Sequence, residues 1–170
     1  GWEDSDTIVG DDGNDLIGGD QGDDYLFGGN GDDSIFGSTG NDYIDGGAGN
    51  NVLGGDEGND LIYGNNGNDL IWGGAGDDRI YGYGGFDQLY GDDGNDTIYG
   101  GILSSVINGG AGNDYIFGYD GWNILIGGAG DDTIFAGAGN DTIYGDEGND
   151  QIVAGAGDDQ IGRASCRERV

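Results

Sequence analysis

The chain has 170 residues, of which 44 are glycine and none is proline or methionine, and its 34 acidic residues outweigh 4 basic ones to give a formal net charge of −30. So acidic a surface repels nucleic acids and anionic membranes and attracts cations. A chain this polar cannot bury enough apolar surface to offset its loss of conformational entropy, so its stability has to come from another source. No apolar run is long enough to span a membrane, and neither nucleic-acid binding nor membrane insertion is expected.

Both ends of the chain differ from those of a complete protein. The first residue is Gly1 and no signal-peptide pattern follows it, which predicts a fragment of a longer protein. Residues 161–170, IGRASCRERV, contain three of the 4 arginines and the single cysteine. This segment resembles a translated sequencing adapter and is expected not to be native; a basic tail with a reactive thiol is the alternative. Residues 1–160 then form one domain with one arginine and 33 acidic residues (34 less Glu168), a charge of −32.

A repeat of nine residues begins at Gly1 and continues in one register to Gly162, which gives eighteen units. A typical unit is GGNGDDSIF, starting at Gly28. Positions one and four are glycine with two exceptions each, and position eight is isoleucine or leucine in every unit. The exceptions are Ala136 and Ala154 at position one, and Asp4 and Leu103 at position four.

One short strand is predicted in each unit, at 7–9, 16–18, 25–27 and every nine residues thereafter to 160–162. Position eight is the one side chain that points inward, with positions seven and nine pointing outward on either side. The six residues between strands are rich in glycine, asparagine and aspartate, which favour turns and left-handed backbone angles. A helix is excluded because each glycine would cost about 1 kcal/mol relative to alanine and the apolar spacing does not fit a period of 3.6.

The unit resembles the G-G-x-G-x-D-x-U-x nonapeptide of the RTX, or haemolysin-type, calcium-binding repeat family, and the match extends over essentially all of residues 1–160. The resemblance implies an all-β fold, a right-handed parallel β-roll (β-solenoid) with two nonapeptides per coil, and hence about nine coils from the eighteen units. It also implies ions bound between turns on the same edge of adjacent coils. Members of the family are toxins, proteases, epimerases and adhesins exported by type I systems, which implies a secreted, extracellular module.

The residues themselves favour calcium. Position six is aspartate in fifteen of the eighteen units, so most turns offer a carboxylate beside several carbonyl oxygens. Calcium accepts six to eight oxygen ligands in flexible geometry, whereas softer metals need the histidine or cysteine that residues 1–160 lack. A turn-capping role is the alternative for these aspartates, but carboxylates stacked about 4.8 Å apart would repel one another without a cation.

With two units per coil, as in the family, the position-six residues form two columns on opposite edges. The complete column is aspartate throughout, whereas the interrupted column contains Asn51, Ser105 and Asn123. The aspartates of the complete column are Asp6, Asp24, Asp42, Asp60, Asp78, Asp96, Asp114, Asp132 and Asp150. Those of the interrupted column are Asp15, Asp33, Asp69, Asp87, Asp141 and Asp159.

The number of calcium ions follows from the gaps between adjacent coils. Nine turns in the complete column leave eight gaps. In the interrupted column three gaps join two aspartates, and these are Asp15–Asp33, Asp69–Asp87 and Asp141–Asp159. We therefore expect about eleven calcium ions, whose charge of about +22 offsets most of the −32 of residues 1–160.

Apolar residues gather in three stacked turns of the interrupted column, two of which lack the position-six aspartate. They are Tyr83, Phe86, Ile102, Leu103, Tyr119 and Trp122. They either stack to compensate for lost calcium or form an interaction patch for another chain or an adjacent domain of the parent protein. Aromatic residues at position nine predict ladders of cross-strand pairs along both sheets. The alternative for these ladders is a polysaccharide-binding groove, with bound calcium bridging to an anionic glycan.

No catalytic site is expected in this segment. Its position-six aspartates are nearly equivalent, whereas catalysis by a carboxylate pair needs two different environments. Residues 1–160 contain no histidine, lysine or cysteine to act as base or nucleophile, and no H-E-x-x-H motif. Any catalytic domain is expected to lie outside these residues.

Overall fold

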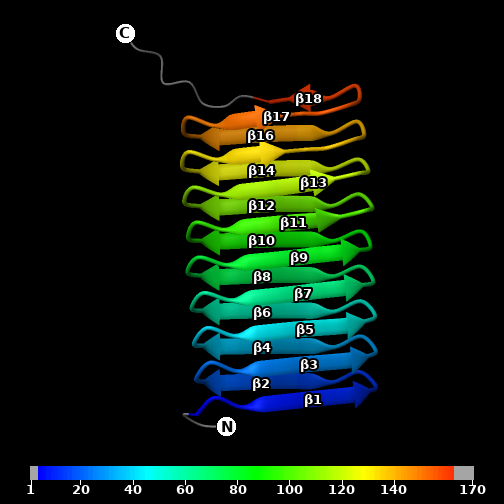
Figure 1. Ribbon diagram of the computed structural model, residues 1–170, viewed down its shortest axis with the longest axis vertical. Helices are drawn as coiled ribbons and strands as arrows, with labels where there is room; N and C mark the ends of the chain where they lie inside the picture. The colour runs from blue at the N-terminus through cyan, green and yellow to red at the C-terminus, as the bar shows by residue number, and fades with distance from the viewer. Residues whose placement is uncertain (1–3, 163–170) are drawn as a thin grey trace.

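Each nonapeptide forms one turn and one strand, because its apolar residue at position eight has to be buried while its glycines let the chain reverse direction. The structure is a computed structural model that describes residues 4–162 and stacks these half-coils into a solenoid of nine coils (Figure 1). The described residues form strands and turns only, and no helix able to cross a membrane occurs among them. The predicted adapter segment falls almost wholly on residues 163–170, which lie outside the described residues.

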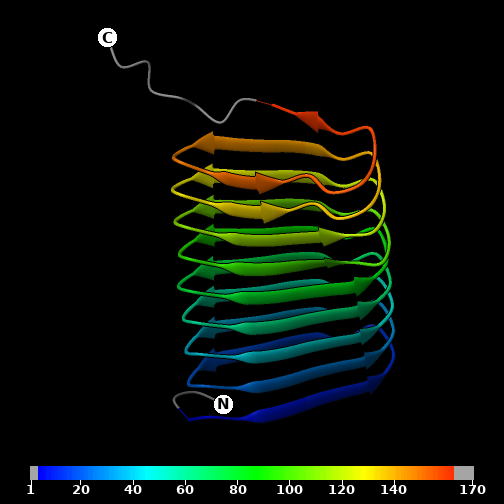
Figure 2. The same cartoon turned by 45° about the horizontal axis from the view of Figure 1, so that its top comes forward.

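Successive strands alternate between two parallel sheets, so each coil contributes one strand to each sheet (Figure 2). Neighbours within a sheet are eighteen residues apart and in register, as Ile80 is with Ile98. The predicted parallel β-solenoid is confirmed. The first sheet contains β1 (Thr7–Asp12), β3 (Tyr25–Asn30), β5 (Tyr43–Ala48), β7 (Leu61–Asn66), β9 (Arg79–Gly84), β11 (Thr97–Gly101), β13 (Tyr115–Tyr119), β15 (Thr133–Phe135) and β17 (Gln151–Val153). The second sheet contains β2 (Leu16–Gln21), β4 (Ser34–Thr39), β6 (Val52–Glu57), β8 (Leu70–Ala75), β10 (Gln88–Asp93), β12 (Val106–Ala111), β14 (Ile124–Ala129), β16 (Thr142–Glu147) and β18 (Gln160–Ile161).

Most strands are six residues long, which is twice the predicted length. In β8 the strand does not end at Trp72 but continues through position one of the next unit, Gly73, to Ala75. The alternation of burial therefore extends further, and Asp69, Ile71 and Gly73 are all buried. The prediction of a single inward position was wrong, because a glycine and an aspartate give no apolar signal even where the strand geometry turns them inward.

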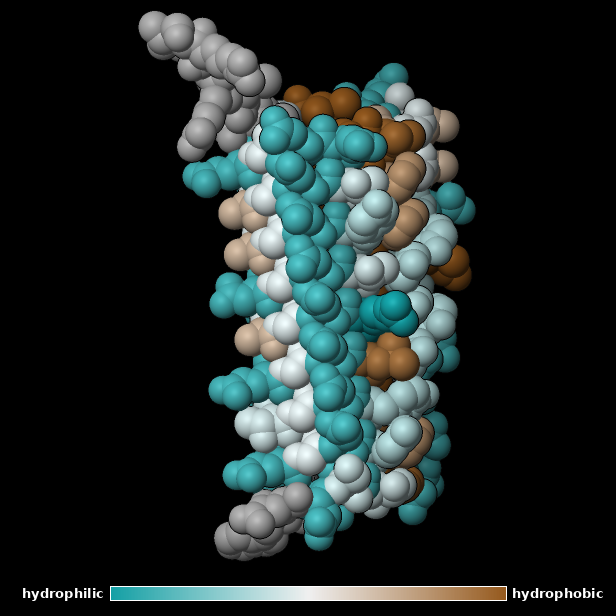
Figure 3. Space-filling model, turned by 60° about the vertical axis from the view of Figure 1, so that its left-hand side comes forward, coloured by the Kyte–Doolittle hydropathy of each residue, from teal (hydrophilic) through white to brown (hydrophobic). Residues whose placement is uncertain are grey.

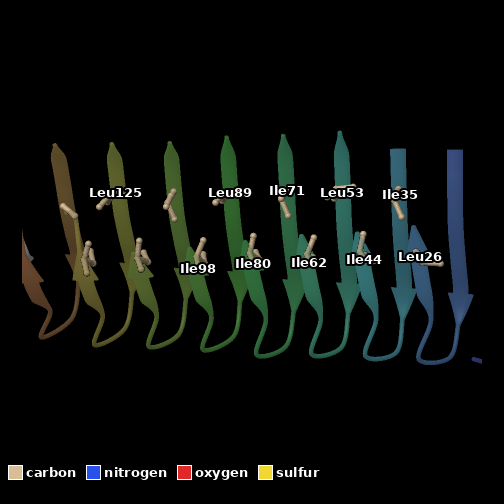
Figure 4. Close-up of a cluster of buried hydrophobic side chains, with 14 of the residues drawn as sticks. Leu26, Ile35, Ile44, Leu53, Ile62, Ile71, Ile80, Leu89, Ile98 and Leu125 are labelled. Carbon is tan, nitrogen blue, oxygen red and sulfur yellow. The ribbon is translucent and has the colours of Figure 1, made fainter. Parts of the chain in front are cut away.

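The core consists of two facing columns of position-eight side chains, one from each sheet (Figure 4). From Leu26 to Ile143 these side chains have no exposed surface. Ile8 and Ile152 are only partly buried, because they belong to the end strands of the first sheet and have a neighbouring coil on one side only. The core is thus one side chain thick, and each coil depends on its neighbours to complete it.

Aromatic ladders were predicted along both sheets, but the one ring contact among the described residues of the second sheet is the stacked pair Trp72–Tyr90. The ladder predicted on the outer face of the first sheet is present. Its ring centroids are 4.7–5.1 Å apart and its interplanar angles are 8–15°. Because this separation is close to one strand spacing, each ring covers a face of its neighbour. The stacked rings are Tyr63, Tyr81, Tyr99, Phe117 and Phe135.

Two strands of the first sheet are shortened where alanine replaces glycine at position one. β15 and β17 end directly before Ala136 and Ala154. At the equivalent Gly10, a Cβ would lie 2.5 Å from Oδ2 of Asp15 and 2.6 Å from the carbonyl oxygen of Gly28. A real methyl group cannot occupy that space, so the backbone leaves the regular strand path at these two positions.

A matched pair of leucine substitutions tests the thin core. Leu89 has no exposed surface, whereas Leu16 is 82% exposed. We expect Leu89→Ala to lower the free energy of unfolding by about 2–5 kcal/mol, because it opens a cavity in the column. Leu16→Ala is expected to change it by less than about 0.5 kcal/mol. Urea unfolding in saturating calcium measures both values, and equal effects would contradict the assignment of the core.

Candidate metal centres

The aspartates at position six point into the roll at its two edges, where each turn leads into the next strand. In the middle coils they are buried, and Asp78 exposes 1% of its surface. Both columns are therefore rows of inward carboxylates stacked along the roll. Near the ends Asp6, Asp15, Asp150 and Asp159 are partly exposed.

One oxygen of each carboxylate joins neighbouring coils. In the complete column, Oδ1 accepts a hydrogen bond from the backbone N–H of the position-six residue one coil earlier, over 2.7–3.1 Å. The same bond occurs in the interrupted column, where Asn51 and Asn123 accept it over 3.0 and 2.9 Å. Asparagine preserves this bond because its Oδ1 accepts a hydrogen bond as the carboxylate oxygen does.

The second carboxylate oxygen, Oδ2, is buried and has no hydrogen-bond partner within residues 4–162 at most of these positions. Burial of a charged oxygen without a donor or a counter-ion is strongly unfavourable. Arg79 is the one basic residue in this range, so side chains cannot neutralise the columns. The residues concerned are Asp15, Asp24, Asp33, Asp42, Asp60, Asp69, Asp78, Asp87, Asp96, Asp114, Asp132, Asp141 and Asp150.

Oδ2 lies next to the glycine at position one of its own unit. A Cβ on Gly10 would be 2.5 Å from Oδ2 of Asp15 and 2.6 Å from the carbonyl oxygen of Gly28, one coil later. The missing side chain thus leaves a space on which a charged and a neutral oxygen converge, and oxygens of both kinds are ligands that calcium accepts. Glycine at position one is therefore the residue that keeps this space open.

Burial raises the pKa of several carboxyls in the middle coils from the usual value of 3.8. The pKa rises to about 8 for Asp78, to about 7 for Asp132 and to about 6 for four others. Loss of hydration is the largest cause, and repulsion by Asp60 and Asp96 adds to it at Asp78. The columns therefore favour any state in which the carboxylates are neutralised, by protons or by metal cations. The four others are Asp60, Asp69, Asp96 and Asp114.

A second ladder, at position five, was not predicted. Where position five is asparagine or aspartate, its side-chain oxygen accepts a hydrogen bond from the position-five N–H one coil later, as Asp77 does from Asn95 over 2.8 Å. At the edge of the complete column this ladder is continuous from Asp23 to Asn149. Figure 3 shows that edge as a hydrophilic ridge along the roll. The signal was available, because position five is asparagine or aspartate in fourteen of eighteen units.

The three substitutions in the interrupted column each remove the charged oxygen. Nδ2 of Asn51 donates a hydrogen bond to the carbonyl oxygen of Gly49 over 3.3 Å. The Ser105 hydroxyl is too short to reach across, and Cδ1 of Ile107 lies 3.1 Å from the place of a Cβ on Gly100. At Asn123 an amide nitrogen faces the site in place of a carboxylate oxygen.

The six apolar residues singled out in the sequence are all exposed, between 43% and 74%. They lie on the edge that carries the interrupted column, on its two shoulders, by which we mean the surface next to the first sheet and the surface next to the second sheet. Tyr83, Ile102 and Tyr119 line a groove beside the first sheet, and Phe86 and Trp122 line another beside the second sheet. This exposure favours an interaction patch over buried packing.

The donor set fits calcium. Within residues 4–162 no three carboxylate, imidazole or thiolate side chains come together as a metal cluster, because each coil supplies at most one inward carboxylate per edge. Backbone carbonyl oxygens must then provide the remaining ligands, and an all-oxygen, flexible set is what calcium prefers. The fold and these buried carboxylates together define a β-solenoid with candidate cation sites in its turns.

Comparison with known families agrees with this class. The model of the RTX calcium-binding nonapeptide repeat matches residues 1–35, 18–53, 27–62, 54–89, 72–102, 104–134 and 126–161. The chain therefore belongs to the RTX calcium-binding nonapeptide repeat family, whose repeats bind calcium. A search of curated proteins found no match.

Acid is expected to induce folding of the metal-free chain. These carboxyls have a pKa of about 6 to 8 in the folded state and of 3.8 in the unfolded chain, so the folded state holds their protons more tightly. Their contribution to the stability of the fold is complete below pH 3.8 and is lost as the pH rises through 6 to 8. Far-ultraviolet circular dichroism of metal-stripped protein should therefore show β structure increasing from pH 8 to pH 5. A midpoint near pH 4 would contradict this, because it would indicate that ordinary exposed carboxylates control the transition.

A second substitution pair tests the glycine at position one. In Gly73→Ala the methyl group would contact Oδ2 of Asp78 and lie 2.8 Å from the carbonyl oxygen of Gly91. We expect it to bind about one calcium ion fewer than the wild type, measured by equilibrium dialysis. Gly18→Ala is the control, since nothing lies within 4 Å of its Cβ. An unchanged stoichiometry in Gly73→Ala would show that this space is not part of a site.

Proposed function

We propose that this segment is a calcium-triggered folding module, in which calcium binding at the two edges and folding of the roll are one equilibrium. The observation that carries the proposal is the row of buried Oδ2 atoms without hydrogen-bond donors. Folding without metal would bury these charges uncompensated. A cation that binds only the folded state stabilises it by linkage.

Each ion is proposed to lie between two turns of the same column. Its ligands include Oδ2 of a position-six aspartate and the position-one carbonyl oxygen one coil later, the two oxygens that converge beside the glycine. Eight gaps in the complete column and three in the interrupted column give about eleven ions. The gap between Asp141 and Asp159 is the weakest of these, because Ala136 stands at position one.

The biological role follows from the same equilibrium. A chain that stays unfolded at low cytosolic calcium is suited to export by a type I system. It would fold outside the cell, where affinities of about 10⁻⁴ to 10⁻³ M suffice. The roll is proposed to be a non-catalytic part of a secreted toxin, protease, epimerase or adhesin, whose activity lies in other segments.

Adjacent aspartates provide the test. Asp78 is buried with an unpartnered Oδ2, whereas its neighbour Asp77 is exposed and belongs to the position-five ladder. Asp78→Asn should raise the calcium midpoint of folding, followed by circular dichroism, several-fold, because the site that Oδ2 of Asp78 lines loses its charged ligand. Asp77→Asn keeps its Oδ1 acceptor and should leave the midpoint nearly unchanged.

Two results would count against the proposal. One is a full β signal in excess chelator at neutral pH, which would separate folding from calcium. The other is an equal shift in the two variants, which would mean that total charge, and not the buried column, determines the response.

A further inference from the structure

Two tyrosines have a backbone conformation that is unfavourable for them. Tyr83 in β9 and Tyr119 in β13 both have a φ of +66°. The other non-glycine residues with positive φ in the described chain are aspartate, asparagine or serine, whose short polar side chains tolerate this region better. Strain of this kind at a bulky residue points to a functional reason for its presence.

The two tyrosines flank a slot above β11. β9 and β13 are the neighbours of β11, and Gly101 is paired in register with both Tyr83 and Tyr119. The tyrosine positions are therefore two strand spacings apart, about 9.6 Å. A cavity of about 300 Å³ lies there, lined by both tyrosines, Tyr99, Gly101 and Ile102 among others.

The slot is bounded by aromatic ring faces. The ring of Tyr83 is nearly parallel to that of Tyr81, at 19°, and the ring of Tyr119 is 31° from that of Tyr99. Because these rings stack along the roll, the faces of Tyr83 and Tyr119 turn toward the slot. A planar group between them would lie about 4.8 Å from each ring, close to the 4.7 Å that separates Tyr81 from Tyr99.

Gly101 keeps the slot open. A Cβ on Gly101 would overlap the carbonyl oxygen of Tyr83, so no side chain can be placed there. Tyr83 and Tyr119 form a second row of rings beside the ladder, and the coil between them cannot supply a ring at Gly101. A group held between the two tyrosines has to come from another molecule.

The charge of the surroundings favours a cation. Residues 1–160 carry −32, and about eleven calcium ions would still leave about −10. Asp45 lines the adjoining groove on the other side of Tyr83, and Asp120 follows Tyr119 directly. The one basic residue of the described chain, Arg79, is four residues before Tyr83, about 13 Å along an extended strand.

We propose that the slot binds the guanidinium group of an arginine from a basic partner polypeptide. Tyrosine faces attract a cation within about 6 Å of the ring centroid. A guanidinium is planar and stacks on two faces at once, whereas the ammonium of lysine is a strongly hydrated point charge.

The other shoulder of the same edge extends the contact surface. Phe86 and Trp122 flank Ser104 as the tyrosines flank Gly101, and they line a second groove. Ile102 and Leu103, both exposed, follow Gly101 in the turn between the two grooves. A partner segment that crosses the edge would cover this apolar surface while placing its arginine between the tyrosines.

The test uses the full chain in saturating calcium and the peptide acetyl-Gly-Arg-Gly-amide, followed by nuclear magnetic resonance. We expect upfield ring-current shifts of the arginine side-chain protons and at least five-fold weaker binding of the matched lysine peptide. The double variant Tyr83→Asn, Tyr119→Asn should bind the arginine peptide at least ten-fold more weakly. Asparagine suits this backbone, since Asn65 occupies the same position in β7 with a φ of +70°.

Tyr115→Asn is the control, because Tyr115 is an exposed tyrosine of β13 outside the slot. Circular dichroism in calcium checks that each variant folds. If the double variant does not fold, the wild-type shifts decide, because a guanidinium held by general charge attraction shows no upfield shift. Unchanged binding in a folded double variant, equal binding of the lysine peptide, or occupation of the slot by methyl glucoside or acetyl-phenylalanine-amide instead would overturn the proposal.

Discussion

The whole roll depends on the burial of one carboxylate per turn, of which only one oxygen has a hydrogen-bond donor in the described chain. Oδ1 is committed to the N–H of the previous coil, as Asp78 Oδ1 is to Asp60 over 2.7 Å. Oδ2 then has no donor within reach. A carboxylate with one oxygen hydrogen-bonded to the backbone and the other facing the space beside the position-one glycine is suited to a cation that takes several oxygen ligands in flexible geometry. The same carboxylate therefore joins adjacent coils through Oδ1 and creates their requirement for a counter-charge through Oδ2.

The parts of this arrangement that depend on period alone could be predicted from the sequence. The column of position-eight side chains, the parallel stacking and the two rows of aspartate follow from counting residues in nines and eighteens. The length of the strands could not be predicted, because it depends on Gly73 and its equivalents extending a ladder without an apolar side chain to mark it. Two further features also depend on contacts between coils, which no single unit contains. They are the different roles of Oδ1 and Oδ2 and the ladder through Asp77 and Asn95.

The two edges of the roll differ in how well their coils are tied together. At the complete edge, both the inner carboxylates and the outer position-five ladder continue without a break. At the other edge, Phe86 donates its N–H to Asn68 but has no side-chain oxygen for the next coil. One coil later Ser105 lacks the inner carboxylate. The two losses fall in adjacent coils, and the exposed apolar residues gather at the same place. A partner bound there would stabilise the coils that calcium stabilises least.

This location also bears on the aromatic ladder as a surface for polysaccharide. Sugars bind aromatic side chains through the ring faces, but the faces of Tyr81 and Tyr99 are covered by their ladder neighbours, which leaves mainly ring edges to solvent. Faces become available where the ladder is incomplete, and Gly101 produces such a place between Tyr83 and Tyr119. A regular repeat multiplies one kind of site along its length, and here that site suits calcium. Selective recognition of a larger partner needs a position where the repeat changes, and the coil that contains Gly101 and Ser105 changes it on both shoulders of one edge.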